Sequence, residues 1–320
     1  MTIGIAAYGR DAGLAVLRAL AAVEAVGRGA IGGFVSMVAI SSAGVLVRAE
    51  TQRGGSARLF EGGLASAPGA LLEAGIAGLM SSGPDRPEPL SQFTPALADV
   101  GLVTGHRMPN TMGAGGLNLN DEVLDLLRRG IGVDEAVQRV LAANPGSDAG
   151  VIALSIHGEV CAADSAHVER RGDRGRALLR AAGGDAVVAV LHNSIHPVRP
   201  LAQLAAEVAL DVMLPADRAD GRIRLRSGTP LRLGPANAVE IAPDGMVETV
   251  LVEDPRFLDG GWSLGLGHET AVLGAGRLMG AMLYEPYLVV QDGLVKTLDG
   301  RDDIFIPIRV SADRAPPGRL

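Results

Sequence analysis

One short segment of the chain gathers several residue types that could do chemistry. Residues 104–110 hold a threonine, a histidine, an arginine and an asparagine around a glycine and a proline. A guanidinium can bind a carboxylate through two parallel hydrogen bonds, and an amide or a glycine N–H can hold an oxyanion. A polar turn made rigid by Pro109 would contain the same residue types. The segment therefore predicts either a binding and catalytic loop or a structural turn, and its candidate residues are Thr104, His106, Arg107 and Asn110.

A second group of polar residues follows the apolar stretch 186–191. His192 and His196 have the spacing of two metal ligands on one helix face. Pro197 comes immediately after and a predicted strand comes before, so the segment favours a turn in which that helical geometry is absent. We expect a polar loop at a strand end and keep a metal site as an alternative. The third ligands available to a metal are Asp185 and His268, and the expected pocket residues are His192, Asn193 and Ser194.

The other polar groups support weaker predictions. Residues 50–55 form a charged strand exit, from which we select Arg53 as a substrate-binding residue. Lys296 is the only lysine and falls in a predicted surface hairpin, which argues against lysine chemistry. Asp164, Ser165 and His167 are too close in sequence for a catalytic triad, because triads converge from separate segments. Near a predicted helix start, the pocket candidates are His268 and Glu269.

Composition and charge narrow the class of protein. The 320 residues carry a net charge of −7, which argues against a nucleic-acid partner because phosphate binding needs a basic surface. Cys161 is the only cysteine, so an intramolecular disulfide and a thiolate metal cluster are excluded. The sequence shows no secretory signal, and no apolar run could span a bilayer. We expect a cytoplasmic protein that acts on a small molecule without cofactor or metal, and its many apolar helices favour a homo-oligomer.

The elements that must position these residues are apolar strands and apolar helices. Residues 2–7 predict a short strand, and 34–50 predict a hairpin that turns at 42–44. The other predicted strands are a hairpin over 151–164, a strand over 186–191, several strands over 222–257 and a β segment that runs to 310. The predicted helices are 12–26, 65–80, 121–129, 133–143, 201–213 and 267–283.

The apolar runs are continuous rather than alternating, which predicts sheets buried on both faces. Hairpins interleaved with apolar helices then indicate an α+β fold in which helices cover layered sheets. We expect a first region over 1–182 and a frayed tail over 313–320. The α+β region over 183–312 either stands alone or completes the same compact domain.

Three motifs follow one another in the first half of the chain. Thr104-Gly105-His106 precedes a helix, residues 130–136 (Gly-Ile-Gly-Val-Asp-Glu-Ala) start a second helix, and 149–158 form a glycine-turn hairpin. Residues 12–55 add a helix, a Gly-Arg-Gly turn, a hairpin and Arg53-Gly54-Gly55. With this order, the chain resembles the N-terminal nucleophile (Ntn) hydrolases. The resemblance is to their isoaspartyl peptidase and plant-type asparaginase branch and to a bacterial group of Ntn-like proteins that begins Met-Thr.

The resemblance implies a layered αββα fold, in which stacked antiparallel sheets lie between helices, and the hydrolysis of a small amide. That branch carries an internal Gly-Thr-Val-Gly autocleavage site, and this sequence has none. The expected nucleophile is therefore Thr2 after removal of Met1, with its own α-amine as the base. The resemblance places 104–110 beside Thr2. Its implied catalytic residues are Thr104 and Asn110, and its implied substrate-binding residues are His106 and Arg107.

Two alternatives remain open. The first is a non-catalytic protein of the same fold that binds a small ligand in the 104–110 pocket. The second is a metal-dependent enzyme built on His192 and His196.

Overall fold

The computed structural model describes residues 1–214, 219–267 and 269–311, which form a mixed α+β chain with two compact units. The units span Met1–Pro215 and Ala216–Leu320. The predicted boundary at 182 lies too early, because strand β10 (Val187–Asn193) pairs along its whole length with strand β1 (Thr2–Tyr8). Sheet pairing therefore ties the segment after 182 to the first unit. The predicted tail, 313–320, lies outside the described residues.

The first unit is built around a six-stranded sheet in the order β3-β2-β4-β1-β10-β9. Every neighbouring pair in it is antiparallel. The central strands are buried along almost their whole length, as the continuous apolar runs predict. The bounds of the four strands not yet given are β2 Val35–Ile40, β3 Leu46–Thr51, β4 Ile76–Ser82 and β9 Arg174–Arg180.

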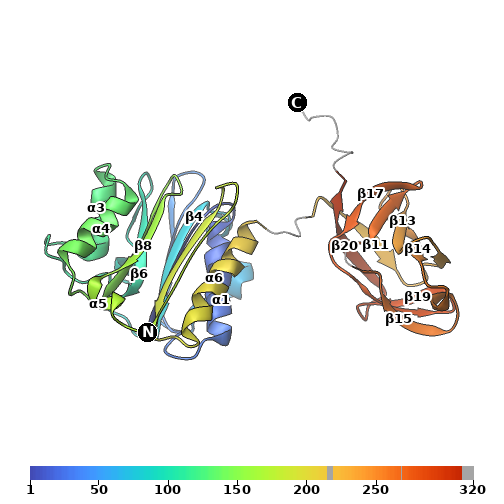
Figure 1. Ribbon diagram of the computed structural model, residues 1–320, viewed down its shortest axis with the longest axis horizontal. Coiled ribbons are helices and arrows are strands. Elements are labelled where there is room, and N and C mark those ends of the chain that lie inside the picture. Colours follow the sequence, from blue (N-terminus) through green and yellow to red (C-terminus); the bar gives the residue numbers. More distant parts are fainter. Residues whose placement is uncertain (215–218, 268, 312–320) are drawn as a thin grey trace. The chain divides into compact units, whose positions relative to one another are not determined.

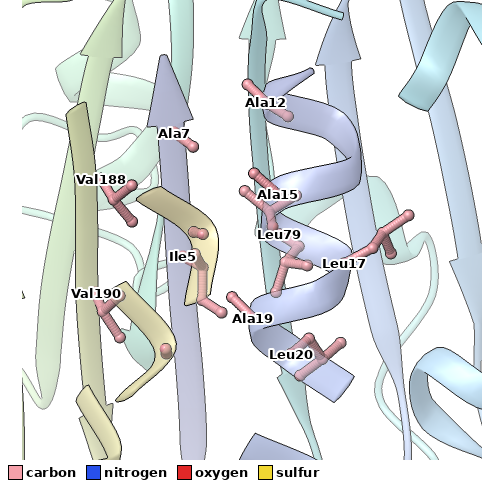
Figure 2. Close-up of a cluster of buried hydrophobic side chains, with 14 of the residues drawn as sticks. Ile5, Ala7, Ala12, Ala15, Leu17, Ala19, Leu20, Leu79, Val188 and Val190 are labelled. Carbon is pink, nitrogen blue, oxygen red and sulfur yellow. The ribbon is translucent and has the colours of Figure 1, made fainter. Parts of the chain in front are cut away.

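Two long helices cover one face of this sheet. They are α1 (Ala12–Val26) and α6 (Val198–Met213), which pack against each other and against the sheet. Figure 2 shows side chains of β1 and β4 next to the alanine-rich side of α1, with Val188 and Val190 of β10 in the same cluster. Small side chains on α1 let the helix lie close to the strands. No helix within the described ranges is long and apolar enough to cross a membrane.

A four-stranded sheet in the order β5-β6-β7-β8 covers the opposite face (Figure 1). Gly4 of β1 and Gly105 of β6 meet where the sheets touch, and a Cβ at Gly4 would overlap the Gly105 backbone. Helices α3 (Leu119–Arg128) and α4 (Val133–Ala143) pack on the outer face of this second sheet. Its strands are β5 Ala96–Leu97, β6 Gly101–Arg107, β7 Ala149–Ser155 and β8 Val160–Asp164.

The predicted helix over 65–80 is wrong. Its residues 76–80 belong to β4, which lies between β1 and β2 and is fully buried. A continuous apolar run fits a buried strand as well as a helix, so periodicity does not separate the two. The remaining short helices of this unit are η1 Gly55–Arg58, η2 Gly63–Ser66, α2 Gly69–Leu72, η3 Leu90–Phe93 and α5 Ala166–Glu169.

The described residues of the second unit form strands around their own apolar core, with one short helical turn, η4 (Pro255–Leu258). A seven-stranded sheet has the order β11-β20-β17-β16-β13-β14-β12, and a three-stranded sheet has the order β15-β18-β19. Their bounds are β11 Gly221–Arg226, β12 Leu231–Leu233, β13 Ala238–Ile241, β14 Val247–Val252, β15 Gly261–Gly265, β16 Ala271–Gly274, β17 Arg277–Met282, β18 Tyr287–Gln291, β19 Leu294–Leu298 and β20 Asp303–Val310.

The predicted helix over 267–283 is also wrong, because β16 and β17 form a hairpin there. Gly274, Gly276 and Gly280 weaken a helix over this segment, and Gly276 adopts a left-handed backbone in the turn with φ of 72°. The strands predicted over 222–257 are confirmed, as is the β segment near the end of the described chain.

Candidate active site

Several strands of the first unit begin or end at the same edge of the two sheets. Thr2 opens β1, and the residues opposite it are Ser82 at the end of β4 and Asn193 at the end of β10. The last residue of β6, Arg107, reaches Thr2 from the second sheet. Antiparallel pairing thus brings together side chains that are far apart in sequence.

The Thr2 hydroxyl is held by two hydrogen bonds. Its Oγ1 donates to Asn193 Oδ1 at 2.8 Å and accepts from the backbone N–H of Arg107. The backbone N–H of Thr2 donates to the same Asn193 oxygen at 3.2 Å. Thr2 is 2% exposed. One amide oxygen therefore holds the nitrogen and the hydroxyl of Thr2 together.

The hydrogen bonds around Thr2 close into a ring. Asn193 Nδ2 donates to Ser194 Oγ at 3.4 Å, and Ser194 Oγ donates to Asp173. Arg107 Nη2 donates to Asp173 at 2.8 Å, and the Arg107 backbone returns to Thr2. Burial raises the pKa of Asp173, but the Ser194 hydrogen bond and the Arg107 charge outweigh it and lower that pKa to about 2. The ring joins four separate segments, at residues 2, 107, 173 and 193–194, and contains an ionised carboxylate at neutral pH.

Arg107 donates hydrogen bonds to this ring from both its backbone and its side chain. Its φ of 64° is left-handed, a conformation that costs about 1–3 kcal/mol in a residue other than glycine. Its guanidinium is 6% exposed and bonds Asp148 at 3.0 Å as well as Asp173. Two carboxylates neutralise this arginine, so its charge is already matched within the protein.

Arg86 is the second arginine at this edge, and it has a different environment. Its Nε donates to Ser82 Oγ at 2.9 Å, and its guanidinium lies 5.8 Å from the Phe34 ring centroid. No carboxylate of the described residues forms an ion pair with it. Burial, Arg86 and Arg107 together lower the pKa of the Met1 amino group. A cation without a matching carboxylate therefore lies close to the N-terminus.

Met1 precedes the buried Thr2 in this chain. Its side chain is 47% exposed, and its sulfur accepts a hydrogen bond from the Ala30 N–H at 3.2 Å. Because Thr2 itself is buried, a substrate could reach its hydroxyl only if some of the residues that cover it are displaced.

The structure does not bring all the predicted site residues to Thr2. Thr104 Oγ1 donates to the Leu79 carbonyl between the sheets at 2.9 Å. Asn110 Nδ2 donates to Gln92 at 2.8 Å. Arg53 is exposed and pairs with Asp85 at 2.8 Å. Each of these side chains makes its hydrogen bonds elsewhere, and residues 104–107 lie in a strand rather than in the expected loop.

The two predicted histidines are buried. His106 is 0% exposed and bonds Asp164 at 2.6 Å, so it is not an open substrate-binding group. His192 is also 0% exposed and bonds the carbonyl of Val198, the first residue of α6, at 2.8 Å. Burial lowers the pKa of His192 to about 4. His192 therefore lies in the fold as a neutral side chain that bonds the start of α6.

The described parts of the chain contain no ligand cluster that supports the metal-dependent alternative. There, no group of three or more His, Cys, Asp or Glu side chains could hold a metal ion. His192 lies in strand β10 rather than on a helix with His196. The strand ends at Asn193, so the expected turn begins at Ser194. The proposed third ligand His268 lies outside the described residues.

Sequence reasoning missed Arg86, Asp148 and Asp173. Arg86 follows a Gly-Pro-Asp stretch, which is typical of an irregular loop, and Asp173 lies in an arginine-rich segment, which is typical of a solvated face. The available signal is positional: each residue lies within a few positions of a strand end, and those ends lie opposite Thr2 (β4), Arg107 (β7) or Asn193 (β9).

Comparison with protein families gives two matches. Residues 2–222 match a domain of unknown function, DUF6963, and residues 228–303 match another domain of unknown function, DUF7259. The first match nearly coincides with the first compact unit, and the second falls inside the other unit. No curated protein matches the chain.

Proposed function

Because the chain belongs to the DUF6963 family, whose description assigns no activity, we propose its function from the geometry around Thr2. We propose that the first unit hydrolyses a small amide with Thr2 as an N-terminal nucleophile. In this proposal the two sheets and their helices are the αββα layers of an Ntn hydrolase. The observation that carries it is the Thr2 hydroxyl, held between Asn193 and the Arg107 N–H at the start of a central strand.

The proposed reaction begins when removal of Met1 leaves the Thr2 α-amine free. Thr2 Oγ1 attacks the amide carbonyl, and the α-amine takes the hydroxyl proton. The tetrahedral intermediate then breaks its C–N bond, and the protonated α-amine gives its proton to the departing amine. Water hydrolyses the resulting ester on Thr2. Asn193 positions the nitrogen and the hydroxyl, and its Nδ2, whose bond to Ser194 is long at 3.4 Å, supplies the oxyanion donor.

The electrostatics at this edge support the choice of base. Burial and two arginines lower the pKa of the Met1 amine, and the same charges would act on the Thr2 amine after processing. A lowered pKa leaves more of the amine unprotonated at neutral pH, which general-base catalysis requires.

Arg86 is the proposed anchor for a substrate carboxylate. The earlier choices were Arg53 and Arg107, but Arg53 pairs with Asp85 at the surface and Arg107 is held by two aspartates. Arg86 lies near the N-terminus and forms no ion pair with a described carboxylate. Of the three arginines, it would therefore bind an anionic group most strongly. The proposed substrate is therefore a small amide that carries a carboxylate.

The test combines intact mass with an activity screen. We expect the purified full chain to lack Met1 and to release amine from a panel of small amides, half of them carrying a carboxylate. Thr2→Ala should abolish this release, and Thr2→Ser should retain part of it. A chain that keeps Met1 throughout would overturn the proposal. Binding of these amides without turnover would favour the non-catalytic small-ligand protein instead.

A further inference from the structure

We propose that His106 and Asp164 are positioning residues that aim the Arg107 N–H at the Thr2 hydroxyl. This inference rests on the proposed function for its catalytic meaning. Its structural content, a buried pair that fixes one backbone donor, can be measured without any activity.

The pair is deeply buried and closely bonded. His106 and Asp164 side chains are 0% and 1% exposed, and His106 Nε2 lies 2.6 Å from Asp164 Oδ1. Arg174 Nη1 bonds the other Asp164 oxygen at 3.2 Å. Burial alone would raise the pKa of Asp164, but His106 and Arg174 lower it, so the carboxylate is ionised. A buried carboxylate needs such partners, and removing one of them leaves an uncompensated charge.

The pair bridges one strand to reach its partner. His106 on β6 and Asp164 on β8 both lie opposite Gly150 of β7. A Cβ at Gly150 would overlap the His106 ring and the Asp164 carboxylate. The missing side chain therefore creates the space in which the bridge forms.

The bridge ends one residue before the backbone donor. Arg107 follows His106 directly and has a left-handed backbone, which persists only where its surroundings hold it. On its other side, Asp148 and Asp173 fix the Arg107 guanidinium. The Arg107 peptide is thus held from both ends, and its N–H meets Thr2 Oγ1.

The experiment measures hydrogen exchange of the Arg107 amide and steady-state kinetics on the full chain. We expect Asp164→Asn to speed Arg107 exchange at least about tenfold and to lower kcat by about tenfold or more, with KM changed little. Gly150→Ala should act in the same direction because it closes the space. His106→Gln keeps a hydrogen-bond donor toward Asp164, so it should retain part of the wild-type protection of the Arg107 amide.

The control is Cys161→Ala. Cys161 lies in β8 with Asp164, is buried, and packs among the residues under α3 and α4. It should lower stability while leaving Arg107 exchange and kcat unchanged. The proposal is overturned if Asp164→Asn and Cys161→Ala behave alike, or if Arg107 exchange does not respond to any of the three site variants. If Asp164→Asn does not fold, His106→Gln and Gly150→Ala decide. A wild-type chain without Thr2-dependent turnover refutes the proposed function, while Arg107 exchange still decides the positioning role.

Discussion

The two compact units differ in what they bury. The first unit buries a histidine–aspartate pair, a second histidine and an asparagine at one edge of its sheets. Among the described residues of the second unit, the buried polar side chains are only Thr229, Thr249 and Thr270. Buried charges and amides cost free energy unless they are bonded, so their concentration at one edge supports the proposed site there.

The charges of the second unit lie at its surface. Its ion pairs include Arg224 with Asp303, whose side chains are 37% and 35% exposed, and Arg256 with Asp254. Such pairs contribute little to stability, typically below about 1 kcal/mol. The difference teaches that a polar residue points to a site only where it is buried and shares hydrogen-bond partners, as in the first unit.

The strongest test compares one asparagine from each unit. Asn193→Ala removes the oxygen that holds both Thr2 atoms, and we expect kcat to fall about a hundredfold because the nucleophile loses its orientation. Asn237→Ala in the second unit removes hydrogen bonds to Glu253 and Leu266, and kcat should not change. Steady-state kinetics of the two variants provide the comparison. Equal losses in both would break the proposed division between the units.

Acid should destabilise the first unit selectively. The pKa of His192 is about 4 in the fold because burial lowers it from 6.5. The unfolded state therefore binds a proton between these values and the folded state does not, so stability falls as pH drops below 6.5. Between pH 7 and pH 5, proton binding to His192 in the unfolded state should lower the free energy of unfolding by about 2 kcal/mol. Below pH 4 both states are protonated and the cost no longer grows.

Two optical signals separate the units in this measurement. Trp262 is the only tryptophan and lies in the second unit, whereas α1, α3, α4 and α6 all lie in the first. The urea concentration at the unfolding midpoint, followed by helical circular dichroism, should fall from pH 7 to 5. In His192→Gln the part of this fall that comes from His192 should be absent. Tryptophan fluorescence should show no matching change. A wild-type pH dependence retained in His192→Gln would contradict the assignment.

The sequence predicts local structure well where turns and caps bound an element. The hairpin over 34–50, the helix over 12–26 and the pair of helices before β7 are confirmed. It fails at 65–80 and 267–283, where an apolar run fits a buried strand as well as a helix. The strand at β4 is selected by its neighbours β1 and β2, which lie far from it in sequence.

The candidate site shows the same limit. Thr2 and the 104–107 segment could be predicted as neighbours only through the resemblance, and the structure brings Arg107 to Thr2. The partner Asn193 lies 191 residues away, and its place opposite Thr2 depends on strand register. Polar residues such as Asp173 have ordinary sequence surroundings, so only the fold reveals that they share a ring.

A smaller effect should come from Arg86. Replacing it by glutamine removes a positive charge near the N-terminal amine, so the pKa of the Thr2 amine should rise by up to about one unit. The acidic limb of the pH–kcat/KM profile should move upward by the same amount, because the amine must be unprotonated to act. Arg53→Gln is the matched control, since Arg53 is exposed and pairs with Asp85. A limb that moves equally in both variants would assign the shift to general surface charge.

The smallest effect is expected from removing the second unit. The cores under α1 and α6, under α3 and α4, and between the two sheets consist of residues before 215, as does every residue of the Thr2 ring. A chain of residues 1–214 should therefore fold by itself and keep kcat and KM within about twofold of the full chain. Helical circular dichroism would verify the fold, and the amide screen would measure the kinetics. A folded but inactive 1–214 chain would mean that the second unit supplies part of the site, and the contrast between the units would then be one of cooperation rather than of separate roles.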